Sequence, residues 1–304
     1  MTIFSNETAA GLAQLIDYVY TFAAGAVPGK YPPPFPPGIP AGYTVVALAQ
    51  AVDDFWGYTN PQYYGLVAKA TGQVVVAGRG TSDITEWLID FEFPLTLLAP
   101  ITGAGSVEEG FYRVFSPPSF VDPNGNPFDL PTYLTDAIQS NPQVQIIVEN
   151  HSPGGAILSM LALTLSCAST SVKNAAMVYS FASPAPGDGD FATAYNSGAP
   201  QTFRIWNPWD LVPSAPPSFP GYSQVADAGV KLAPTISQLE PYDFHSVECN
   251  HSLRTSQWLL DSQYPLLSSC EWGADAVAPQ MDRPARLQTA AAHMRARQLA
   301  EPRN

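Results

Sequence analysis

The stretch QVQIIVENHSPGGAILSMLALTLS, residues 143–166, joins a β-branched run to a long apolar segment through a glycine-rich turn. Residues 143–148 predict a buried strand, and Ala156–Ser166 predicts a buried helix because apolar residues cover every side of it. A strand that turns sharply into a helix at a serine is typical of a nucleophile elbow, which lifts the serine oxygen above the end of a sheet. Ser152 is therefore a candidate nucleophile, and Gly154 is one of the small residues that the crowded turn requires.

Strand-like and helix-like segments also alternate along the rest of the chain. Thr71-Gly72, for example, separates two β-rich runs and predicts a hairpin. The alternation predicts an α/β fold whose sheet is at least partly parallel, with helices on both faces. Functional residues are expected just after the strands, at their carboxyl ends. The predicted strands are Tyr63–Ala70, Gln73–Ala77, Ala175–Phe181 and Thr202–Trp206, and the predicted helices include residues 6–24 and Thr255–Leu260.

The charge of the chain restricts its partners. The 304 residues carry a net charge of −13, which argues against nucleic-acid binding because no basic surface is available to displace counterions from phosphates. Residues 283–304 hold five arginines and one glutamate, so this tail carries about +4 and residues 1–282 carry about −17. We expect residues 1–282 to form a single domain, with the tail as a surface helix or a frayed end.

Targeting signals are weak in this sequence. The N-terminus lacks a basic region and contains Glu7 and Asp17, which is unlike a secretory signal. No run reaches the ~18 apolar residues of a membrane span. The expectation is a cytoplasmic protein or one secreted by a non-standard route. Seven prolines between residues 28 and 40 exclude a helix or a central strand there, so this segment should be a surface connection.

The three cysteines do not suggest a metal site or a disulfide framework. Cys167, Cys249 and Cys270 include no C-x-x-C pair. A bridge between Cys249 and Cys270 is one alternative, but free buried thiols are the expectation.

The elbow and four other stretches resemble the motifs of one family, in the same order. His151-Ser152-Pro153-Gly154-Gly155-Ala156 resembles the H-S-L-G-G-A elbow of the class 3 lipases, the family of fungal triacylglycerol lipases and their bacterial relatives. The resemblance implies an α/β-hydrolase fold with a mostly parallel central sheet and a lid. The other stretches are Gly78-Arg79-Gly80-Thr81-Ser82 (R-G-T/S), Glu109-Gly110-Phe111 (H-x-G-F), Tyr179–Pro184 with Gly187-Asp188 (T-F-G-S-P…G-D) and Arg204–Pro213 (R-V-x-N-x-x-D-x-V-P).

The resemblance implies a Ser–Asp–His triad, in the chain order expected for this fold. Ser152 is then the nucleophile, and Asp210, which follows the strand Thr202–Trp206, orients the base. The implied chemistry is acyl transfer through an acyl-enzyme on Ser152, which needs no metal and no organic cofactor.

The base has to be a histidine that follows Asp210. We prefer His251, because Asn250-His251-Ser252-Leu253 precedes a predicted helix, much as the bacterial members place their histidine on a loop before the last helix. His245 stays as the alternative. His293 lies in the arginine-bearing tail, and His151 adjoins Ser152 too closely to act as its base.

Two residues of the elbow depart from the family pattern. Asn150 replaces the first small residue, and its side chain has to find room. Pro153 occupies the position whose backbone N–H is an expected oxyanion-hole donor, and proline has no N–H. Loss of one donor typically lowers turnover about 10²–10³-fold. The remaining donors would be the N–H and hydroxyl of Thr81, helped by the N–H of Gly154.

Residues 83–100, DITEWLIDFEFPLTLLAP, are more apolar than an exposed loop should be. In the family the corresponding stretch is a lid that opens at a lipid–water interface. The alternative is an ordinary buried helix and loop beside the site. An apolar entrance suits acyl chains in either case. The candidate lid or substrate-facing residues are Trp87, Leu88, Phe91 and Phe93.

These features predict a lipase-like serine hydrolase of carboxylic esters. The negative charge disfavours anionic lipid surfaces, so neutral glycerides or soluble esters fit the substrate better. Two other functions stay open: a catalytically impaired lipase-fold protein that binds a lipid or a partner, and a feruloyl- or acetyl-esterase. The sequence does not determine the oligomeric state.

Overall fold

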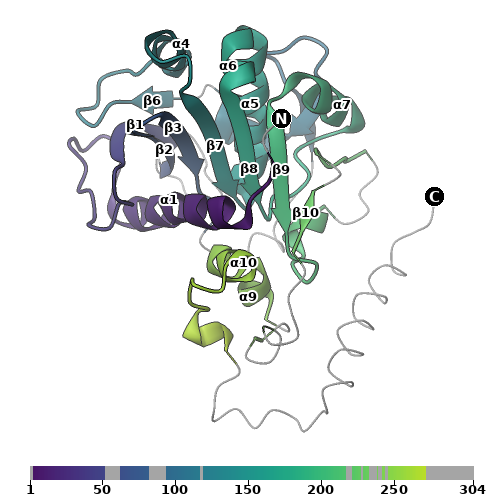
Figure 1. The fold of residues 1–304 in the computed structure, drawn as a ribbon. Coiled ribbons are helices and arrows are strands. Elements are labelled where there is room, and N and C mark those ends of the chain that lie inside the picture. The colour runs from purple at the N-terminus through teal and green to yellow at the C-terminus, as the bar shows by residue number, and fades with distance from the viewer. Residues whose placement is uncertain are drawn as a thin grey trace, which may run out of the picture.

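The computed structural model describes residues 3–51, 62–81, 94–116, 119–216, 221–226, 229–232, 238, 242–243 and 246–271. Within these residues, an eight-stranded sheet lies between two layers of helices (Figure 1). Its strands follow the order β10-β9-β8-β7-β3-β2-β1-β6. Their bounds are β1 Thr44–Ala51, β2 Gln62–Ala70, β3 Gln73–Gly78, β6 Ser119–Val121, β7 Gln145–His151, β8 Ala176–Phe181, β9 Gln201–Trp206 and β10 Val230–Lys231.

The sheet is parallel on the side that carries the elbow. Strands β3, β7, β8, β9 and β10 run parallel to one another, whereas β2, β1 and β6 join the sheet through antiparallel pairs. The predicted hairpin at Thr71-Gly72 is confirmed, because β2 and β3 pair around it and Gly72 has a positive φ of 76°. The carboxyl ends of β3, β7, β8 and β9 therefore meet at one edge of the sheet.

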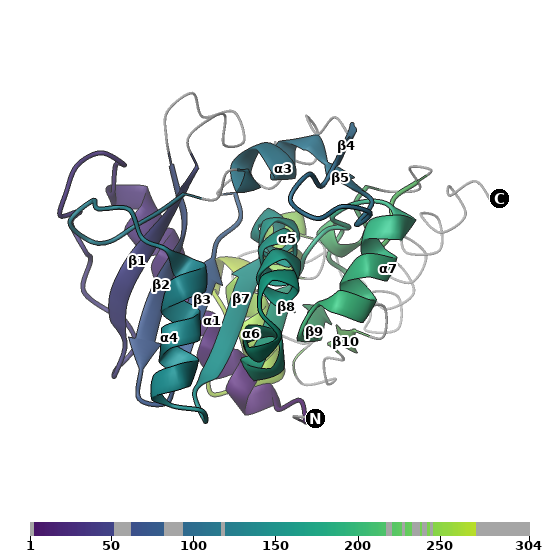
Figure 2. The same cartoon turned by 90° about the horizontal axis from the view of Figure 1, so that it is seen from above.

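The helices cover both faces of the sheet, as Figure 2 shows from above. One face packs against α1 and α10, and the other packs against α3, α4, α5 and α7. A small hairpin of β4 and β5 lies beside α3 (Figure 2). The bounds are α1 Asn6–Gly25, β4 Leu95–Leu97, β5 Ser106–Glu108, α3 Glu109–Phe115, α4 Leu130–Ser140, α5 Pro153–Ala168, α6 Thr170–Ala175, α7 Gly189–Gly198, α9 Val247–His251 and α10 Leu253–Leu260, with 3₁₀ turns η1 at Val212–Ser214 and η2 at Ser268–Cys270.

The strand and the helix formed by residues 143–166 have the burial that their sequence predicts. In β7, Ile146 and Val148 face one hydrophobic core while Ile147 faces the other, so both faces of the strand are buried. Helix α5 is buried on every side except at Thr164, Cys167 and Ala168. The helix is longer than Ala156–Ser166 because Pro153 begins its first turn, where the missing N–H costs no hydrogen bond.

The proline-rich segment runs over the outside of α1, as expected for a surface connection. Its Phe35 ring stacks on Phe22 of α1, with 5.2 Å between centroids. The Tyr18 hydroxyl donates a hydrogen bond to the carbonyl of Pro36 at 3.1 Å. The tail 283–304 and residues 82–93 of the predicted lid lie outside the described residues.

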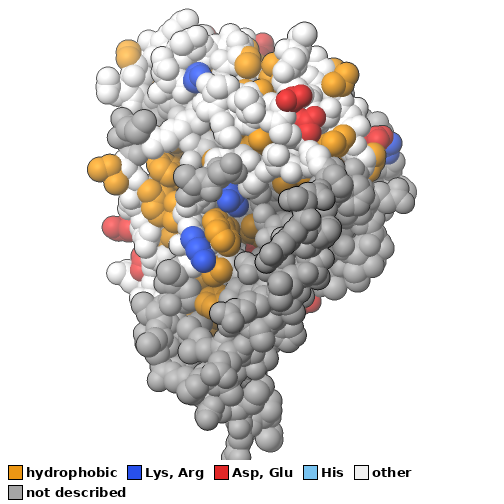
Figure 3. Space-filling model, turned by 90° about the vertical axis from the view of Figure 1, so that its right-hand side faces the viewer, with side chains coloured by type: hydrophobic (Ala, Val, Ile, Leu, Met, Phe, Trp, Pro, Cys, Tyr) orange, Lys and Arg blue, Asp and Glu red, His pale blue; other side chains and the backbone are white. Residues whose placement is uncertain are grey.

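At the β10 end of the sheet, basic and hydrophobic side chains lie together among the described residues. Figure 3 shows this side, where Lys and Arg side chains lie among hydrophobic ones. In β9 the Trp206 ring has Arg204 at 5.7 Å and Lys231 at 5.5 Å from its centroid, which are cation–π distances. Among the described residues, no helix combines the length and hydropathy needed to cross a membrane.

Candidate active site

Ser152 forms a strained turn between β7 and α5. Its φ of 61° and ψ of −145° lie in a region that non-glycine residues rarely occupy, and its exposed fraction is 1%. Backbone hydrogen bonds hold this conformation: the Ser152 N–H donates to the Phe181 carbonyl at 2.9 Å, and the Gly155 N–H donates to the Ser152 carbonyl at 2.8 Å. The sequence-predicted elbow is therefore present, with the serine side chain fixed at the end of the parallel strands.

Glycines allow the backbone to crowd around this turn. A Cβ on Gly80 would lie 2.5 Å from the Cβ of Ser152, so the loop after β3 could not approach the serine with any larger residue. A Cβ on Gly154 would collide with the Arg79 carbonyl in the same loop. The loop 79–81 is thereby held directly against the elbow.

Asn150 finds the room that its larger side chain needs by bonding to the next strand. Its Oδ1 accepts a hydrogen bond from the Ser180 hydroxyl at 2.7 Å, and both side chains are buried. The substitution is thus accommodated between β7 and β8 and leaves the turn intact.

The structure brings Ser152, His251 and Asp210 into one hydrogen-bonded chain. The Ser152 hydroxyl donates to Nε2 of His251 at 2.6 Å, and Nδ1–H of His251 donates to Oδ2 of Asp210 at 2.8 Å. The exposed fractions of Ser152, His251 and Asp210 are 1%, 4% and 5%, so these two hydrogen bonds are shielded from water. The other oxygen of Asp210 accepts from the Val212 N–H at 3.0 Å, which fixes the carboxylate. The alternatives His245 and His293 lie outside the described residues.

His251 is the last residue of the short helix α9, rather than a loop residue as predicted. Ser246 caps this helix by accepting from the Cys249 N–H at 3.1 Å. The Asn250 carbonyl accepts from Nδ2 of Asn207 at 3.1 Å, and the Asn250 side chain accepts from the Tyr242 hydroxyl. Asn207 is the asparagine of the family-like stretch before Asp210. The residues next to the histidine are thus tied to the loop that carries the aspartate.

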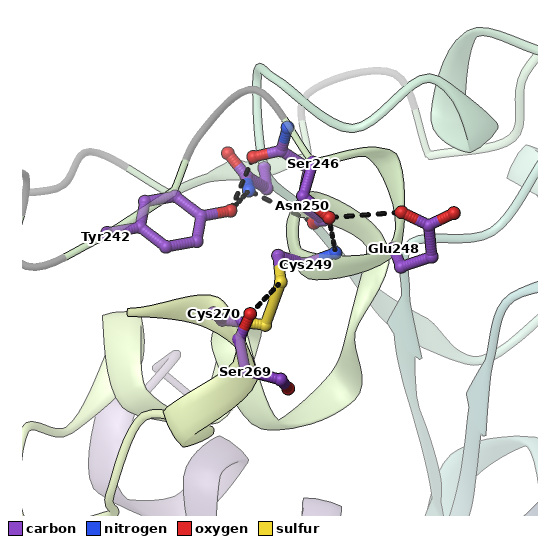
Figure 4. Close-up of a disulfide and its surroundings, with 8 residues drawn as sticks. Tyr242, Ser246, Glu248, Cys249, Asn250, Ser269 and Cys270 are labelled. Atoms are coloured by element: carbon purple, nitrogen blue, oxygen red, sulfur yellow. Dashed lines mark hydrogen bonds between the residues drawn. A yellow bond between two sulfur atoms is a disulfide. The ribbon is translucent and has the colours of Figure 1, made fainter. Parts of the chain in front are cut away.

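The expectation of free buried thiols is wrong for two of the three cysteines. Cys249 and Cys270 form a disulfide with a Cα–Cα distance of 5.4 Å, and Figure 4 shows it beside Asn250. Cys167 is free but exposed. Because the two bridged residues are 21 positions apart, their proximity depends on how the chain returns after α10, which cysteine spacing does not reveal. The bridge lies two residues before His251 and braces α9.

His151 and Tyr20 make contacts at the site that sequence reasoning did not predict. The Tyr20 hydroxyl lies 2.8 Å from Nδ1 of His151, and Nε2 of His151 lies 2.8 Å from the backbone carbonyl of His251. The Tyr20 oxygen also accepts from the Gly80 N–H at 2.8 Å. In the sequence, His151 is distinguished only by being too close to Ser152 to act as its base, and nothing in the helical pattern of residues 6–24 distinguishes Tyr20. The contacts exist only because α1 crosses the sheet beneath the elbow (Figure 1).

The predicted oxyanion region lacks one donor. Pro153 stands directly after Ser152 and begins α5 without an N–H. On the other side, Thr81 is half-buried after a loop that Arg79 holds. The Arg79 guanidinium donates to the carbonyls of Tyr63 at 2.9 Å and Gly80 at 2.8 Å. The geometry therefore leaves the Thr81 side of the site well fixed.

Of the predicted lid, only the last residues fall in the described part of the chain. Trp87, Leu88, Phe91 and Phe93 lie outside it. These last residues include β4, in which Leu95 is 38% and Leu97 is 72% exposed. The paired strand β5 ends at Glu108, whose carboxylate accepts from the N–H groups of Gly110 and Phe111. Burial raises the pKa of Glu108 to about 7.

Comparison with known proteins agrees with the motifs. Residues 75–219 match the family described as Lipase (class 3), which confirms the class 3 lipase resemblance over that range. Phospholipase A1-II 4 of Oryza sativa subsp. japonica is 28% identical to the chain, over 79% of this chain and 61% of its own length. The chain spans about three fifths of the length of the first curated relatives that it matches.

Solved structures establish the fold. The triacylglyceride lipase of Rhizomucor miehei has a TM-score of 0.56 at 20% identity, covering 76% of this chain and 82% of that one. A triacylglycerol lipase described as having a serine protease triad at its catalytic centre has a TM-score of 0.55 at 20% identity, covering 76% and 81%. The α/β-hydrolase fold is therefore confirmed.

Proposed function

From the class 3 lipase match of residues 75–219, we propose that this protein is a serine hydrolase of carboxylic esters. The observation that carries the proposal is the buried hydrogen-bonded chain Ser152–His251–Asp210 at a strained strand-to-helix turn. These three side chains come from distant parts of the sequence, and a nucleophile, a base and an orienting carboxylate in this geometry are what acyl transfer requires.

The proposed reaction proceeds through an acyl-enzyme. Nε2 of His251 takes the Ser152 proton as the serine oxygen attacks the ester carbonyl. The resulting imidazolium, stabilised by Asp210, protonates the departing alcohol, which leaves the acyl group on Ser152. Water then repeats the same steps in place of the alcohol, with His251 again as base, and the carboxylic acid is released. Ser152 is regenerated, and no metal or organic cofactor takes part.

The oxyanion that forms in both halves of the reaction has fewer backbone donors than usual. Pro153 contributes none, so we assign the role to the N–H and hydroxyl of Thr81, supported by the N–H of Gly154. Loss of a donor typically lowers turnover about 10²–10³-fold. The proposed enzyme is therefore complete in its nucleophile and base and slowed at the step that stabilises negative charge.

We propose an apolar acyl ester as the substrate. The exposed Leu95 and Leu97 of β4 belong to the apolar stretch 83–100. We propose this stretch as a lid with Trp87, Leu88, Phe91 and Phe93 facing the substrate. Relatives are named phospholipase A1 and triacylglyceride lipase. The net charge of −13 repels anionic lipid surfaces, so neutral acylglycerols and soluble esters are the preferred substrates.

A finer placement in the family is also proposed. His251 ends α9 and is separated from α10 by Ser252 alone, which resembles the placement of the histidine before the last helix in the bacterial members of the class 3 lipases. This placement is a proposal on that one feature.

Ester turnover by matched variants tests the proposal. Ser152→Ala should abolish hydrolysis of a p-nitrophenyl ester, with Ser159→Ala of the same helix as a control that retains it. His251→Ala should do the same while His245→Ala retains activity. Hydrolysis that survives Ser152→Ala, or that is lost only in the His245 variant, would contradict the assignment.

A series of esters then identifies the substrate class. Acyl chains of increasing length, with and without an oil interface, separate a lipase from a soluble esterase. Feruloyl and acetyl esters and phosphatidylcholine belong in the same series. Preference for long neutral acyl chains supports the proposed class, and preference for feruloyl, acetyl or phospholipid substrates replaces it.

A second function, lipid binding without turnover, is favoured by Pro153 alone. Its signature would be saturable binding of a fluorescent fatty acyl ester by the wild-type protein with no product formed from any ester of the series. Product formation that Ser152→Ala abolishes would exclude this function.

A further inference from the structure

A continuous chain of hydrogen bonds links the two sides of the proposed active site through side chains that do not touch Ser152. The Gly80 N–H donates to the Tyr20 hydroxyl, the Tyr20 oxygen lies 2.8 Å from Nδ1 of His151, and Nε2 of His151 lies 2.8 Å from the carbonyl of His251. Gly80 directly precedes Thr81, and His251 is the proposed base. The chain therefore begins at the oxyanion loop and ends at the backbone of the base.

For a neutral His151 ring, only one arrangement of protons satisfies all three contacts. A backbone carbonyl only accepts, so Nε2 of His151 must carry a proton and donate it to His251. If the imidazole is neutral, Nδ1 accepts, and the Tyr20 hydroxyl donates to it while accepting from Gly80. Burial, and then the nearby His251, lower the pKa of His151, and burial raises the pKa of Tyr20, so its hydroxyl keeps its proton. Each group thus has a defined role as donor or acceptor.

The position of these hydrogen bonds indicates a structural role at the site. His151 is 4% exposed and its ring lies against that of His251, with 4.7 Å between centroids. Asp210 and Ser152 fix the imidazole of His251 from its two nitrogens, but neither fixes the main chain that carries it. His151 does so directly from the elbow, where it adjoins Ser152. His151 therefore connects the nucleophile to the backbone of the base through a single side chain, in addition to the contacts that hold α9 from its other side.

We propose that His151 and Tyr20 are positioning residues that hold the backbone of His251 and the Gly80–Thr81 loop in register with Ser152. The proposal rests on the proposed function in that His251 is taken to be the base. His151 takes no proton from the substrate and does not touch the reacting atoms. It acts through the carbonyl of His251, and Tyr20 acts through His151 and through the Gly80 N–H.

Two amide substitutions test the two ring nitrogens of His151 separately. In His151→Gln the side-chain amide can place an N–H where Nε2 was, so the bond to the His251 carbonyl survives. In His151→Asn the amide oxygen can replace only Nδ1, so the bond to Tyr20 survives and the bond to His251 is lost. His151→Leu loses both. If His151 merely filled space, the smaller Asn would lower thermal stability without a specific loss of kcat.

The expected result is a loss of kcat with KM little changed. His151→Leu and His151→Asn should lower kcat about 10²-fold, as expected for a displacement of the base of roughly 1 Å, and His151→Gln should keep most of it. Tyr20→Phe should lower kcat by less, and its effect should shrink in the His151→Leu background because both act in one chain. Tyr18→Phe is the control, since the hydroxyl of this tyrosine on the same helix bonds to Pro36 instead.

A wild-type protein that hydrolyses no ester would contradict the proposed function. The positioning proposal therefore also needs a measurement that does not depend on turnover. Nitrogen chemical shifts of the ¹⁵N-labelled His151 ring should show a neutral imidazole protonated at Nε2. Protonation at Nδ1 instead would overturn the positioning role whatever the enzyme does. Wild-type kcat in His151→Leu, or equal losses in the Gln and Asn variants at equal thermal stability, would overturn it as well.

Discussion

On the base side of Ser152 every group is held by several contacts, whereas on the oxyanion side one expected donor is missing. His251 is fixed through both ring nitrogens, its backbone is bonded to His151, and the Cys249–Cys270 bridge braces its helix. Opposite it, Pro153 begins α5 without an N–H. In the proposed enzyme, the groups that generate the nucleophile and those that stabilise the transition state are therefore supported separately. Proline keeps the turn intact because it suits a helix start, so we expect Pro153 to affect the proposed chemistry without changing the fold.

The largest expected effect comes from breaking the base side. His251→Ala removes the base, and Asp210→Asn holds the imidazole in the wrong tautomer. Each should lower kcat on the order of 10⁴-fold with a p-nitrophenyl ester. Asp243→Asn is a matched control for the second variant. If either triad variant keeps more than a tenth of the wild-type kcat, the base side does not work as described.

Restoring the missing donor should have the next largest effect, in the opposite direction. Pro153→Leu supplies a backbone N–H at the position where the family pattern has leucine, and kcat should rise by up to about 10²-fold. Pro131→Leu in the first turn of α4 is the control, because it adds an N–H far from Ser152. An unchanged kcat in a folded Pro153→Leu variant would mean that other groups already complete the oxyanion hole.

Strand β7, which leads into Ser152, should make the stability of the protein depend on pH. Glu149 of β7 is fully buried, and its carboxyl oxygens have no hydrogen-bond partner among the described residues. Burial raises its pKa well above the usual range. The folded protein therefore binds this proton more tightly than the unfolded chain, and stability falls as the pH rises above the unfolded pKa of about 4.3, by about 1.4 kcal/mol per pH unit until the folded pKa is reached.

Glu149→Gln removes this dependence. Urea unfolding between pH 4 and pH 8 should show a variant that gains stability over wild type as the pH rises, while the two are similar at pH 4. Asp136→Gln, on α4, should leave the slope unchanged. A wild-type slope that the Glu149 variant retains would place the titrating group elsewhere.

The smallest expected effect is at Ala182, just after β8, where the family pattern has glycine. Its φ of 51° lies in the left-handed region, which costs an L-residue roughly 1–2 kcal/mol. Glycine adopts this φ freely but loses more entropy on folding. Ala182→Gly should therefore stabilise the protein by about 0.5–1 kcal/mol in urea unfolding. A lower midpoint would mean that the buried methyl group contributes more packing than the strain costs.

The local parts of this structure could be predicted from the sequence, and the contacts between distant segments could not. The run 143–148, the hairpin at Thr71-Gly72 and helix α1 follow from periodicity and turn residues, which are local. The elbow followed from a serine among small residues between a strand and a helix. Predicting Asp210 and His251 also required the order of the motifs, because the chain order of the triad limits which positions can supply the partners of Ser152.

Pairs that meet only through the tertiary fold escaped prediction. The Cys249–Cys270 bridge was only the alternative to free thiols, because it depends on the path of the chain after α10 and three cysteines do not form a disulfide framework. The Tyr20–His151 contact joins residues 131 positions apart in the sequence. Ala182 resembles an unremarkable substitution for glycine until its φ is known. For the two pairs the missing information is the distance between two segments, and for Ala182 it is the backbone conformation; local patterns contain neither.

The most direct test of the central claim is covalent labelling of Ser152. A fluorophosphonate is incubated with wild type and with Ser152→Ala, and the peptide that contains residue 152 is identified by mass spectrometry. One adduct per chain on Ser152, slowed strongly by His251→Ala and absent from Ser152→Ala, is the predicted result. No adduct on Ser152 under conditions that label a control serine hydrolase would contradict the claim that this serine is an activated nucleophile.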